Sequence, residues 1–205
     1  MSFGDGLHLD VGKGELRLDL HAHPFEALGF PSPDPKSVEA IIKAARAKGL
    51  DGLAITEHYS PRYGFQAREI AQHYFPGALL IIPGQETRVG HQEVVELYLE
   101  DGLTFKFLAH PQSLHGFQLD RYAIQGIEIE NFLHDDYIDR EGVLRIAEEN
   151  GLLLLRNSDA HLLEEVGNLY NCLTLETLRQ LAWEDRSSQA SPPQRGKGKE
   201  RFPFR

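Results

Sequence analysis

Short apolar segments with the pattern of β-strands end repeatedly on a histidine or a carboxylate in this chain. The first, "ELRLDL" at residues 15–20, alternates apolar and charged residues and runs into "HAHP". Because residues i and i+2 of a strand point to the same side, His21 and His23 would present two imidazoles on one face. Later segments of the same kind run out into Glu57 and His58, Glu86, His110, and Asp159 with His161.

Segments with helical spacing lie between these strands. Residues 34–49 combine Asp34 as N-cap, Pro35 at the first helical position and Gly49 as the stop, which predicts a helix. Further helices are expected over residues 65–75, 140–151 and 174–185, and further strands over 52–58, 78–86, 92–101, 103–111, 123–131 and 152–161. This alternation predicts an α/β fold with a mainly parallel sheet, open or closed into a barrel. In β/α barrels the carboxyl ends of the strands carry the catalytic residues.

Length and composition limit the number of domains and the kinds of metal site that this chain can form. With 205 residues and 41% apolar content, residues 1–186 are expected to form one domain. Residues 187–205 are basic and rich in Ser, Pro and Gly, so a disordered tail is expected there. The single cysteine, Cys172, excludes an internal disulfide and cysteine-based metal clusters. Any metal in this chain must therefore use histidine and carboxylate ligands.

Charge and hydropathy indicate the partners. The formal net charge of -10 argues against binding of long nucleic acids, although it allows a small phosphorylated substrate. No apolar run approaches the roughly 18 residues of a membrane span. The N-terminal residues lack the pattern of an export signal. We therefore expect a cytoplasmic protein that does not bind membranes, and the sequence leaves its oligomeric state open.

The motifs "DLHAHP", "AITEH", "IPGQE" with "GH" five residues on, "LAHP" and "NSDAH" stand in this order over roughly residues 15–175. In this the chain resembles the PHP family, the polymerase and histidinol phosphatase superfamily. The resemblance implies a distorted seven-stranded β/α barrel, a phosphoesterase activity, and two or three divalent metal ions, Mn, Fe or Zn, at the carboxyl ends of the strands. The mixture of imidazole and carboxylate does not choose among these metals.

The resemblance also implies a ligand set. Four residues would surround one metal, with Glu86 bridging to a second: His21, His23, Glu86 and Asp159. His91 and His110 would complete the second site, and His58 and His161 would hold a third metal. Two positions depart from the family pattern: Glu26 is the only candidate for the extra ligand after His-x-His, and Glu57 replaces the usual aspartate. The other histidines, His8, His73, His115 and His134, are expected on the surface or in loops, although His134 and Asp135 could border the pocket.

The expected chemistry is attack of a metal-bridging hydroxide on a phosphoryl group. Glu86 and Asp159 would support this attack as metal-holding carboxylates, and His58, His161 or a third metal would serve the leaving oxygen. Arg88 and Arg156 lie beside ligand-bearing strand ends and are candidate phosphate contacts. The alternatives are that Arg88 points to solvent and that Arg156 forms a structural ion pair.

The sequence lacks the motifs of other common catalytic mechanisms. There is no glycine-rich phosphate loop and no Gly-x-Ser-x-Gly elbow, so nucleotide-driven chemistry and a serine nucleophile are disfavoured. We expect hydrolysis of a small phosphomonoester or short phosphodiester. Two alternatives stay open: a carbon-nitrogen hydrolase of the amidohydrolase type, and a non-catalytic metal-binding module that serves a partner.

Overall fold

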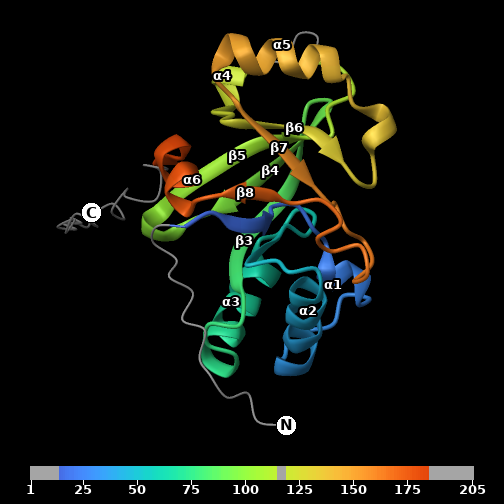
Figure 1. Ribbon diagram of the computed structural model, residues 1–205, viewed down its shortest axis with the longest axis vertical. Helices are drawn as coiled ribbons and strands as arrows, with labels where there is room; N and C mark the ends of the chain where they lie inside the picture. The colour runs from blue at the N-terminus through green and yellow to red at the C-terminus, as the bar shows by residue number, and fades with distance from the viewer. Residues whose placement is uncertain (1–13, 115–118, 185–205) are drawn as a thin grey trace, which may run out of the picture.

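One mixed sheet forms the body of the molecule (Figure 1). The computed structural model describes residues 14–114 and 119–184, which leaves the expected tail at 187–205 outside the described residues. Within this part of the chain the strand order is β7-β6-β5-β4-β3-β2-β1-β8, and β9 pairs with β5 off this path. The strands are β1 (Leu16–Asp19), β2 (Gly52–Ile55), β3 (Leu80–Val89), β4 (Gln92–Tyr98), β5 (Leu103–Ala109), β6 (Gly126–Asn131), β7 (Leu153–Asn157), β8 (Asn171–Leu173) and β9 (Trp183–Glu184).

The sheet is less parallel than the sequence predicts. Strands β1, β2 and β3 are parallel, as are β5, β6 and β7, but β4 runs antiparallel to both β3 and β5. Strands β3 and β4 are joined by a tight turn at Gly90, whose φ of 64° suits glycine. Because a parallel crossover needs a dozen or more residues, so short a link forces an antiparallel pair. Strand β8 is a further antiparallel strand, against β1.

The two ends of this sheet approach each other and nearly close a barrel. Strands β7 and β8 are not paired by a strand ladder, and the side chain of Asn171 bridges them instead. Its Oδ1 accepts a hydrogen bond from the backbone N of Arg156 at 2.9 Å, and its Nδ2 donates to the carbonyl of Arg156 at 2.9 Å. Asn171 therefore stands in for a pair of backbone hydrogen bonds at the seam.

The helices cover the outside of the barrel. Helices α2 (Pro35–Ala47) and α3 (Arg62–Tyr74) lie together at one end in Figure 1, and α5 (Arg140–Asn150) lies at the other. The predicted start of α2 is confirmed: Asp34 Oδ1 accepts from the backbone N of Ser37 at 2.7 Å. The helix predicted over 174–185 ends earlier, since α6 spans Leu175–Leu181 and Trp183–Glu184 form β9. The shorter helices are α1 (Pro24–Ala27) and α4 (Leu119–Tyr122), with 3-10 turns at Glu100–Gly102 and Asp135–Tyr137.

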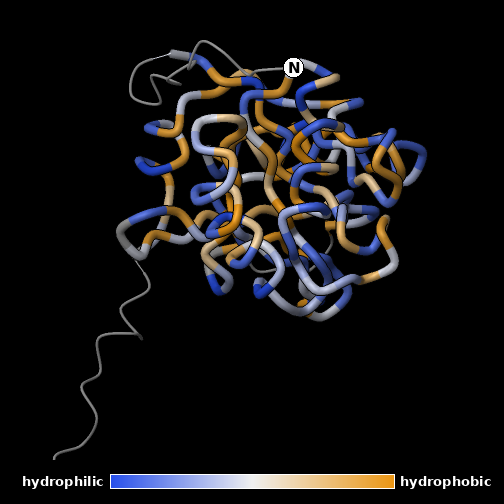
Figure 2. The backbone as a smooth tube through the Cα atoms, turned by 90° about the horizontal axis from the view of Figure 1, so that it is seen from below, coloured by the Kyte–Doolittle hydropathy of each residue, from blue (hydrophilic) through white to orange (hydrophobic). Residues whose placement is uncertain are grey.

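Apolar side chains fill the barrel and leave its open end to polar groups. The hydrophobic stretches of the chain run through the interior in Figure 2, and the hydrophilic ones lie mostly at the periphery. Inside the barrel, Leu18, Leu97, Phe105 and Phe107 are fully buried. The Phe107 ring meets the His21 ring edge-on, with centroids 6.2 Å apart. His21 thus packs directly against the apolar side chains that fill the barrel. No helix in the described part of the chain is long and apolar enough to cross a membrane.

Candidate metal centre

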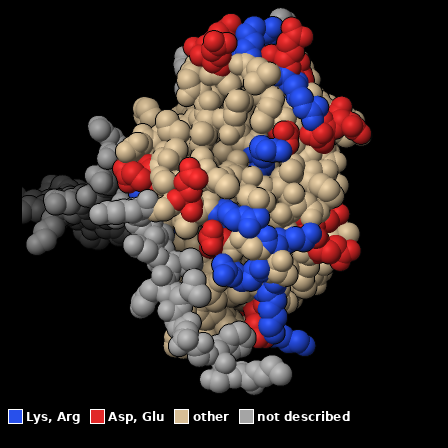
Figure 3. Space-filling view, in the orientation of Figure 1, with Lys and Arg blue, Asp and Glu red and all other residues tan. Residues whose placement is uncertain are grey.

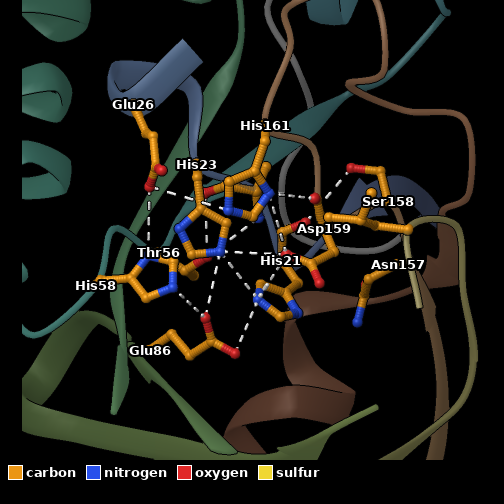
Figure 4. A network of polar contacts seen from close by, with 12 residues as sticks. His21, His23, Glu26, Thr56, His58, Glu86, Asn157, Ser158, Asp159 and His161 are labelled. Carbon is orange, nitrogen blue, oxygen red and sulfur yellow. Dashed lines mark hydrogen bonds and ion pairs between the residues drawn. The ribbon is translucent and has the colours of Figure 1, made fainter. Parts of the chain in front are cut away.

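The polar strand ends converge on one cluster at the open end of the barrel. His21 and His23 follow β1, His58 follows β2, and Glu86 lies in β3 where a bridge links it to His58. Figure 4 shows these side chains and those of Asp159 and His161 pointing toward one another. His110, directly after β5, joins them, since its Nε2 lies 3.3 Å from Glu86 Oε1. The structure therefore brings together seven of the eight predicted metal ligands.

Two buried carboxylates form the centre of the cluster. Glu86 Oε1 lies 3.5 Å from His21 Nε2, and Asp159 Oδ1 lies 3.4 Å from the same nitrogen and 3.3 Å from His23 Nε2. These two carboxylate oxygens are buried and accept no hydrogen bond. A buried charged oxygen without a hydrogen bond is costly. A divalent cation among these oxygens and imidazoles would remove that cost, so the residues present fit a metal.

The ligand atoms divide into neighbouring groups that could each hold an ion. Among the described residues there are four such groups: one has three imidazoles and one carboxylate, two are central, and the last has two carboxylates and one imidazole; within each, the atoms lie within 4.8 Å of one another. The members are His23, Glu26, His58 and His161; His21, His23 and Glu86, overlapping with His21, His110 and Asp159; and Glu86, Glu93 and His110.

Glu26 and Glu57, which depart from the family pattern, have different places. Glu26 Oε2 lies 3.4 Å from His58 Nδ1 and 3.9 Å from His161 Nε2, so it faces the histidine-rich group. Glu57 is buried, and its carboxylate accepts from the backbone N of Phe25 at 2.8 Å and of Glu26 at 3.3 Å. Burial raises the pKa of Glu57 to about 7. Glu57 therefore anchors the turn that carries Glu26 and does not itself join the cluster.

The carboxylates and imidazoles of the cluster stabilise each other's charged forms. Burial alone would lower the pKa of His21, but the surrounding carboxylates, led by Asp159, raise it well above its usual value. Burial would likewise raise the pKa of Glu86, yet the neighbouring His21 holds it well below its usual range. Protons on the imidazoles thus offset buried negative charge. Because metal binding displaces protons from its ligands, cations can take over that role.

A second layer of buried carboxylates lies behind the ligands, and the sequence did not reveal it. Glu128 Oε1 lies 3.0 Å from His21 Nδ1, and Glu128 Oε2 accepts from the backbone N of His110 at 2.8 Å. Asp19 accepts from the hydroxyl of Ser158 at 2.5 Å and from the backbone N of Gly167 at 2.9 Å. These carboxylates orient the segments that carry His21, His110 and Asp159.

Two members of the cluster have a strained backbone. His110 has φ of 27° and Asp159 has φ of 52°, in the left-handed region that residues with a Cβ seldom adopt. Hydrogen bonds hold both: the N of His110 donates to Glu128, and the N of Asp159 donates to the carbonyl of His21 at 2.8 Å. Strain of this kind persists where the surroundings enforce it, as they do at functional sites.

Other predicted residues lie outside the cluster. His91 is exposed at the turn between β3 and β4 and belongs to none of the groups above, so its position does not support a role as ligand. Arg156 is 53% exposed and pairs with Glu130 at 2.5 Å, which agrees with the structural alternative. Arg88 is exposed and lines a cavity beside His110.

The remaining histidines have separate places. His134 approaches the cluster: its Nε2 lies 3.8 Å from Asp159 Oδ2, and its ring centroid lies 4.7 Å from that of His110. His134 thus borders the site, as the sequence left open. His73 is exposed near the end of α3. His8 and His115 lie outside the described residues.

Comparisons with known proteins support the barrel fold, and one family model matches part of the chain. A family model described as PHP-associated matches residues 138–180. The crystal structure of PsfC from Pseudomonas syringae superposes with a TM-score of 0.56 and 16% identity, over 81% of this chain and 88% of PsfC. That of a candidate metal-dependent phosphoesterase from Bifidobacterium adolescentis gives 0.57 and 14% identity, over 80% and 94%.

One curated relative matches part of the sequence. The uncharacterized protein MJ1587 of Methanocaldococcus jannaschii is 27% identical over 94 residues. This match spans 43% of the chain and about half, 53%, of the relative.

The fold and the cluster together define a barrel protein with a site suited to divalent metal ions. The PHP-associated match over residues 138–180 and the shared barrel agree with the resemblance to the PHP family that the ordered motifs indicate. The prediction of a PHP-type barrel is confirmed, although the sheet of the described residues has nine strands where the resemblance implied seven.

Proposed function

We propose that this protein is a metal-dependent phosphoesterase that hydrolyses a small phosphorylated metabolite or nucleotide, as a monoester or a short diester. The observation that carries the proposal is the pair of buried carboxylates, Glu86 and Asp159, each with an oxygen that accepts no hydrogen bond and faces imidazoles at the open end of the barrel. Divalent cations bound there would activate water for attack and neutralise charge on the phosphoryl oxygens. The likeness to the Bifidobacterium protein agrees with this activity.

His58 and His161 are placed to serve the leaving oxygen. Their side chains are 39% and 29% exposed, so both lie at the rim of the cluster where a substrate can reach them. His161 Nδ1 lies 2.9 Å from the carbonyl oxygen of Asp159. Because a carbonyl only accepts, Nδ1 carries the proton and Nε2 faces the site. Nε2 is therefore free to bind a cation or to exchange a proton with the substrate.

A cavity beside the cluster has the size of a small-molecule site. It has a volume of about 450 Å³ and is lined by Arg88, His91, Gln92, Glu93, Ala109, His110, Gln112 and Ser113. Since His110 belongs to both the cavity and the cluster, a substrate whose phosphate is held at the cluster can place the rest of its structure in the cavity. Arg88 lines this cavity, and its guanidinium is the candidate contact for a phosphate oxygen of the substrate.

The distribution of surface charge agrees with a small substrate. On the face drawn in Figure 3, basic side chains gather over α2, whereas acidic and basic ones are mixed around α5. A protein that follows the backbone of a long nucleic acid needs an extended basic surface. The net charge of -10 gives no overall attraction to such a polymer.

The first experiment compares a matched aryl phosphomonoester and aryl phosphodiester with manganese-loaded protein. Asp159→Asn and His23→Ala should abolish hydrolysis and reduce bound metal without unfolding the protein, since both side chains belong to the cluster. His73→Ala changes an exposed histidine of α3 and should leave the rate unchanged. Wild-type turnover in Asp159→Asn would refute the proposal. Metal binding without cleavage of either ester would favour the carbon-nitrogen hydrolase or the non-catalytic module.

A further inference from the structure

We propose that Glu93 is a metal ligand and that it makes its end of the cluster a site for a hard cation such as Mn²⁺, whereas the opposite end suits Zn²⁺. The inference rests on the metal centre of the proposed function and adds a ligand that the family resemblance did not supply. It also assigns different metals to the two ends of one cluster.

The position of Glu93 follows from the register of β4. Val95 pairs with Glu86 on β3 and is buried inside the barrel. Because strand side chains alternate, Glu93 points to the same side as Val95, two residues closer to the open end. There Glu93 Oε2 lies 3.6 Å from His110 Nε2. The side chain is 39% exposed, so it borders the cluster at its solvent side.

The surroundings of His110 show what this end of the cluster offers. His110 Nε2 lies 3.3 Å from Glu86 Oε1, 3.6 Å from Glu93 Oε2 and 3.5 Å from Asp159 Oδ2. Three carboxylates thus face a single imidazole nitrogen. Glu86 Oε1 is buried and accepts no hydrogen bond, which is independent evidence that a cation belongs there.

The other end of the cluster has the opposite composition. There His23, His58 and His161 provide three imidazoles, and Glu26 is the carboxylate grouped with them. The second oxygen of the central Glu86 also reaches this end, 3.3 Å from His58 Nε2. Three histidines and one carboxylate match the donors and the coordination number that zinc prefers. Carboxylate-rich sites suit Mn²⁺ and Mg²⁺ instead. The two ends therefore differ in the metals they favour.

Glu93 takes the role of second-site ligand that the family resemblance implied for His91. Glu93 is the second residue of the antiparallel strand β4, whereas His91 lies two residues earlier, in the exposed turn. The strand geometry thus brings a carboxylate, and not an imidazole, to the second site.

The test titrates metal-free protein with Mn²⁺ and with Zn²⁺. Free Mn²⁺ is measured by electron paramagnetic resonance, and bound metal is counted after dialysis. Glu93→Gln keeps the size of the side chain and removes its charge. The variant should bind Mn²⁺ at one site roughly 100-fold more weakly. Changing a residue that only orients a ligand weakens metal binding by about 10- to 100-fold, so loss of a direct ligand should reach at least the upper end of that range. Zn²⁺ binding at the histidine-rich end should be unchanged. Glu93→His should restore binding at the weakened site and shift its preference toward Zn²⁺.

The matched control is Glu96→Gln. Glu96 lies three residues further along β4, on the opposite face, where it pairs with Lys106 at 2.7 Å. The Mn²⁺ affinity of the Glu96→Gln variant should equal that of the wild type. If Glu93→Gln binds as many Mn²⁺ ions as Glu96→Gln, with the same affinity, the assignment is overturned. Ester hydrolysis is assayed separately, so loss of an Mn²⁺ site in a protein that cleaves no ester would support the ligand and refute only the phosphoesterase.

Discussion

Replacing Glu128 by glutamine should weaken metal binding, although Glu128 lies behind the cluster. Its fully buried carboxylate accepts from the backbone N of His110 at 2.8 Å, from Asn131 Nδ2 at 2.9 Å and from Asn157 Nδ2 at 2.8 Å. It also lies 3.0 Å from His21 Nδ1. Because a carboxylate only accepts, Nδ1 of His21 carries a proton, so Nε2 is the nitrogen that would bind a metal beside Glu86 and Asp159 once the metal displaces its proton.

A glutamine at position 128 disturbs this arrangement in either orientation. Its NH2 group must face either the backbone N of His110 or the pair formed by Asn157 Nδ2 and His21 Nδ1. The amide of Asn157 cannot turn over, since its Oδ1 already accepts from the N of Leu20 at 3.0 Å and from Asn171 at 2.9 Å. The imidazole of His21 can adapt, but only by moving its proton to Nε2. It then loses the lone pair that would bind a metal.

The magnitudes follow from the bonds lost. A hydrogen bond to a charged group contributes about 1.5–3 kcal/mol, and a buried donor left without an acceptor costs about 1–3 kcal/mol. We expect Glu128→Gln to lower the free energy of unfolding by about 3–5 kcal/mol, which a stability of about 5–15 kcal/mol can absorb. Loss of a partner that orients a ligand histidine should weaken metal binding by about 10- to 100-fold.

Two assays check this reasoning. Urea unfolding at neutral pH gives the loss of stability, and titration with Mn²⁺ and Zn²⁺ gives the loss of affinity. Glu130→Gln is the control, because Glu130 lies on the same strand but pairs with Arg156 at the outside. If Glu128→Gln loses stability yet binds metals as tightly as Glu130→Gln, the carboxylate has only a structural role and the argument from the His21 tautomer is wrong.

Asp19→Asn should change how stability depends on pH. Burial raises the pKa of Asp19 from 3.8 to about 6, so the folded state holds this proton more tightly, and the resulting stabilisation is lost as the pH rises from about 4 to about 6. One pKa unit corresponds to about 1.4 kcal/mol, so between these pH values the free energy of unfolding of the metal-free wild type should fall by about 3 kcal/mol relative to that of the variant. Urea unfolding of both proteins at each pH measures this difference, and a difference that does not change with pH would contradict the prediction. Gly64→Ala should lower the free energy of unfolding by about 1–3 kcal/mol, because a Cβ there would lie 2.8 Å from Pro83 Cα and 3.0 Å from the carbonyl of Ile55. Glu69→Ala, an exposed change in the same helix, should cost little, and equal Tm values for the two alanine variants would refute the packing argument.

The ligands at the ends of parallel strands were predictable because the rule that locates them is geometric. Carboxyl ends of parallel strands share one edge of the sheet, so His21, His58 and Asp159 had to approach one another once the strands were recognised. The same rule misses Glu93. Since β4 is antiparallel, its first residues lie at that edge, and they carry no signal that distinguishes them from residues facing solvent.

The buried carboxylates behind the ligands were not predictable for a related reason. In "GIEIEN" the alternation of apolar and acidic residues is typical of a half-exposed strand, which would place Glu128 and Glu130 on the same outer face. An irregularity in the pairing of β6 with β7 separates them: Glu128 is fully buried, and Glu130 faces Arg156. The short strands β8 and β9, with 3 and 2 residues, are too short for any periodicity to show.

The balance of buried charge explains why the cluster needs cations. The buried charged residues in the described part of the chain are the carboxylates Asp19, Glu57, Glu86, Glu128 and Asp159, and no lysine or arginine is buried with them. Uncompensated charges inside a protein cost several kcal/mol each. Burial raises the pKa values of Asp19 and Glu57 to about 6 and about 7, so protons of their own can neutralise these two. For the carboxylates that face the cluster, the compensating positive charge comes from protons on the imidazoles or from bound cations. Because only the folded chain assembles these ligands, each cation that replaces such protons couples its binding free energy to folding.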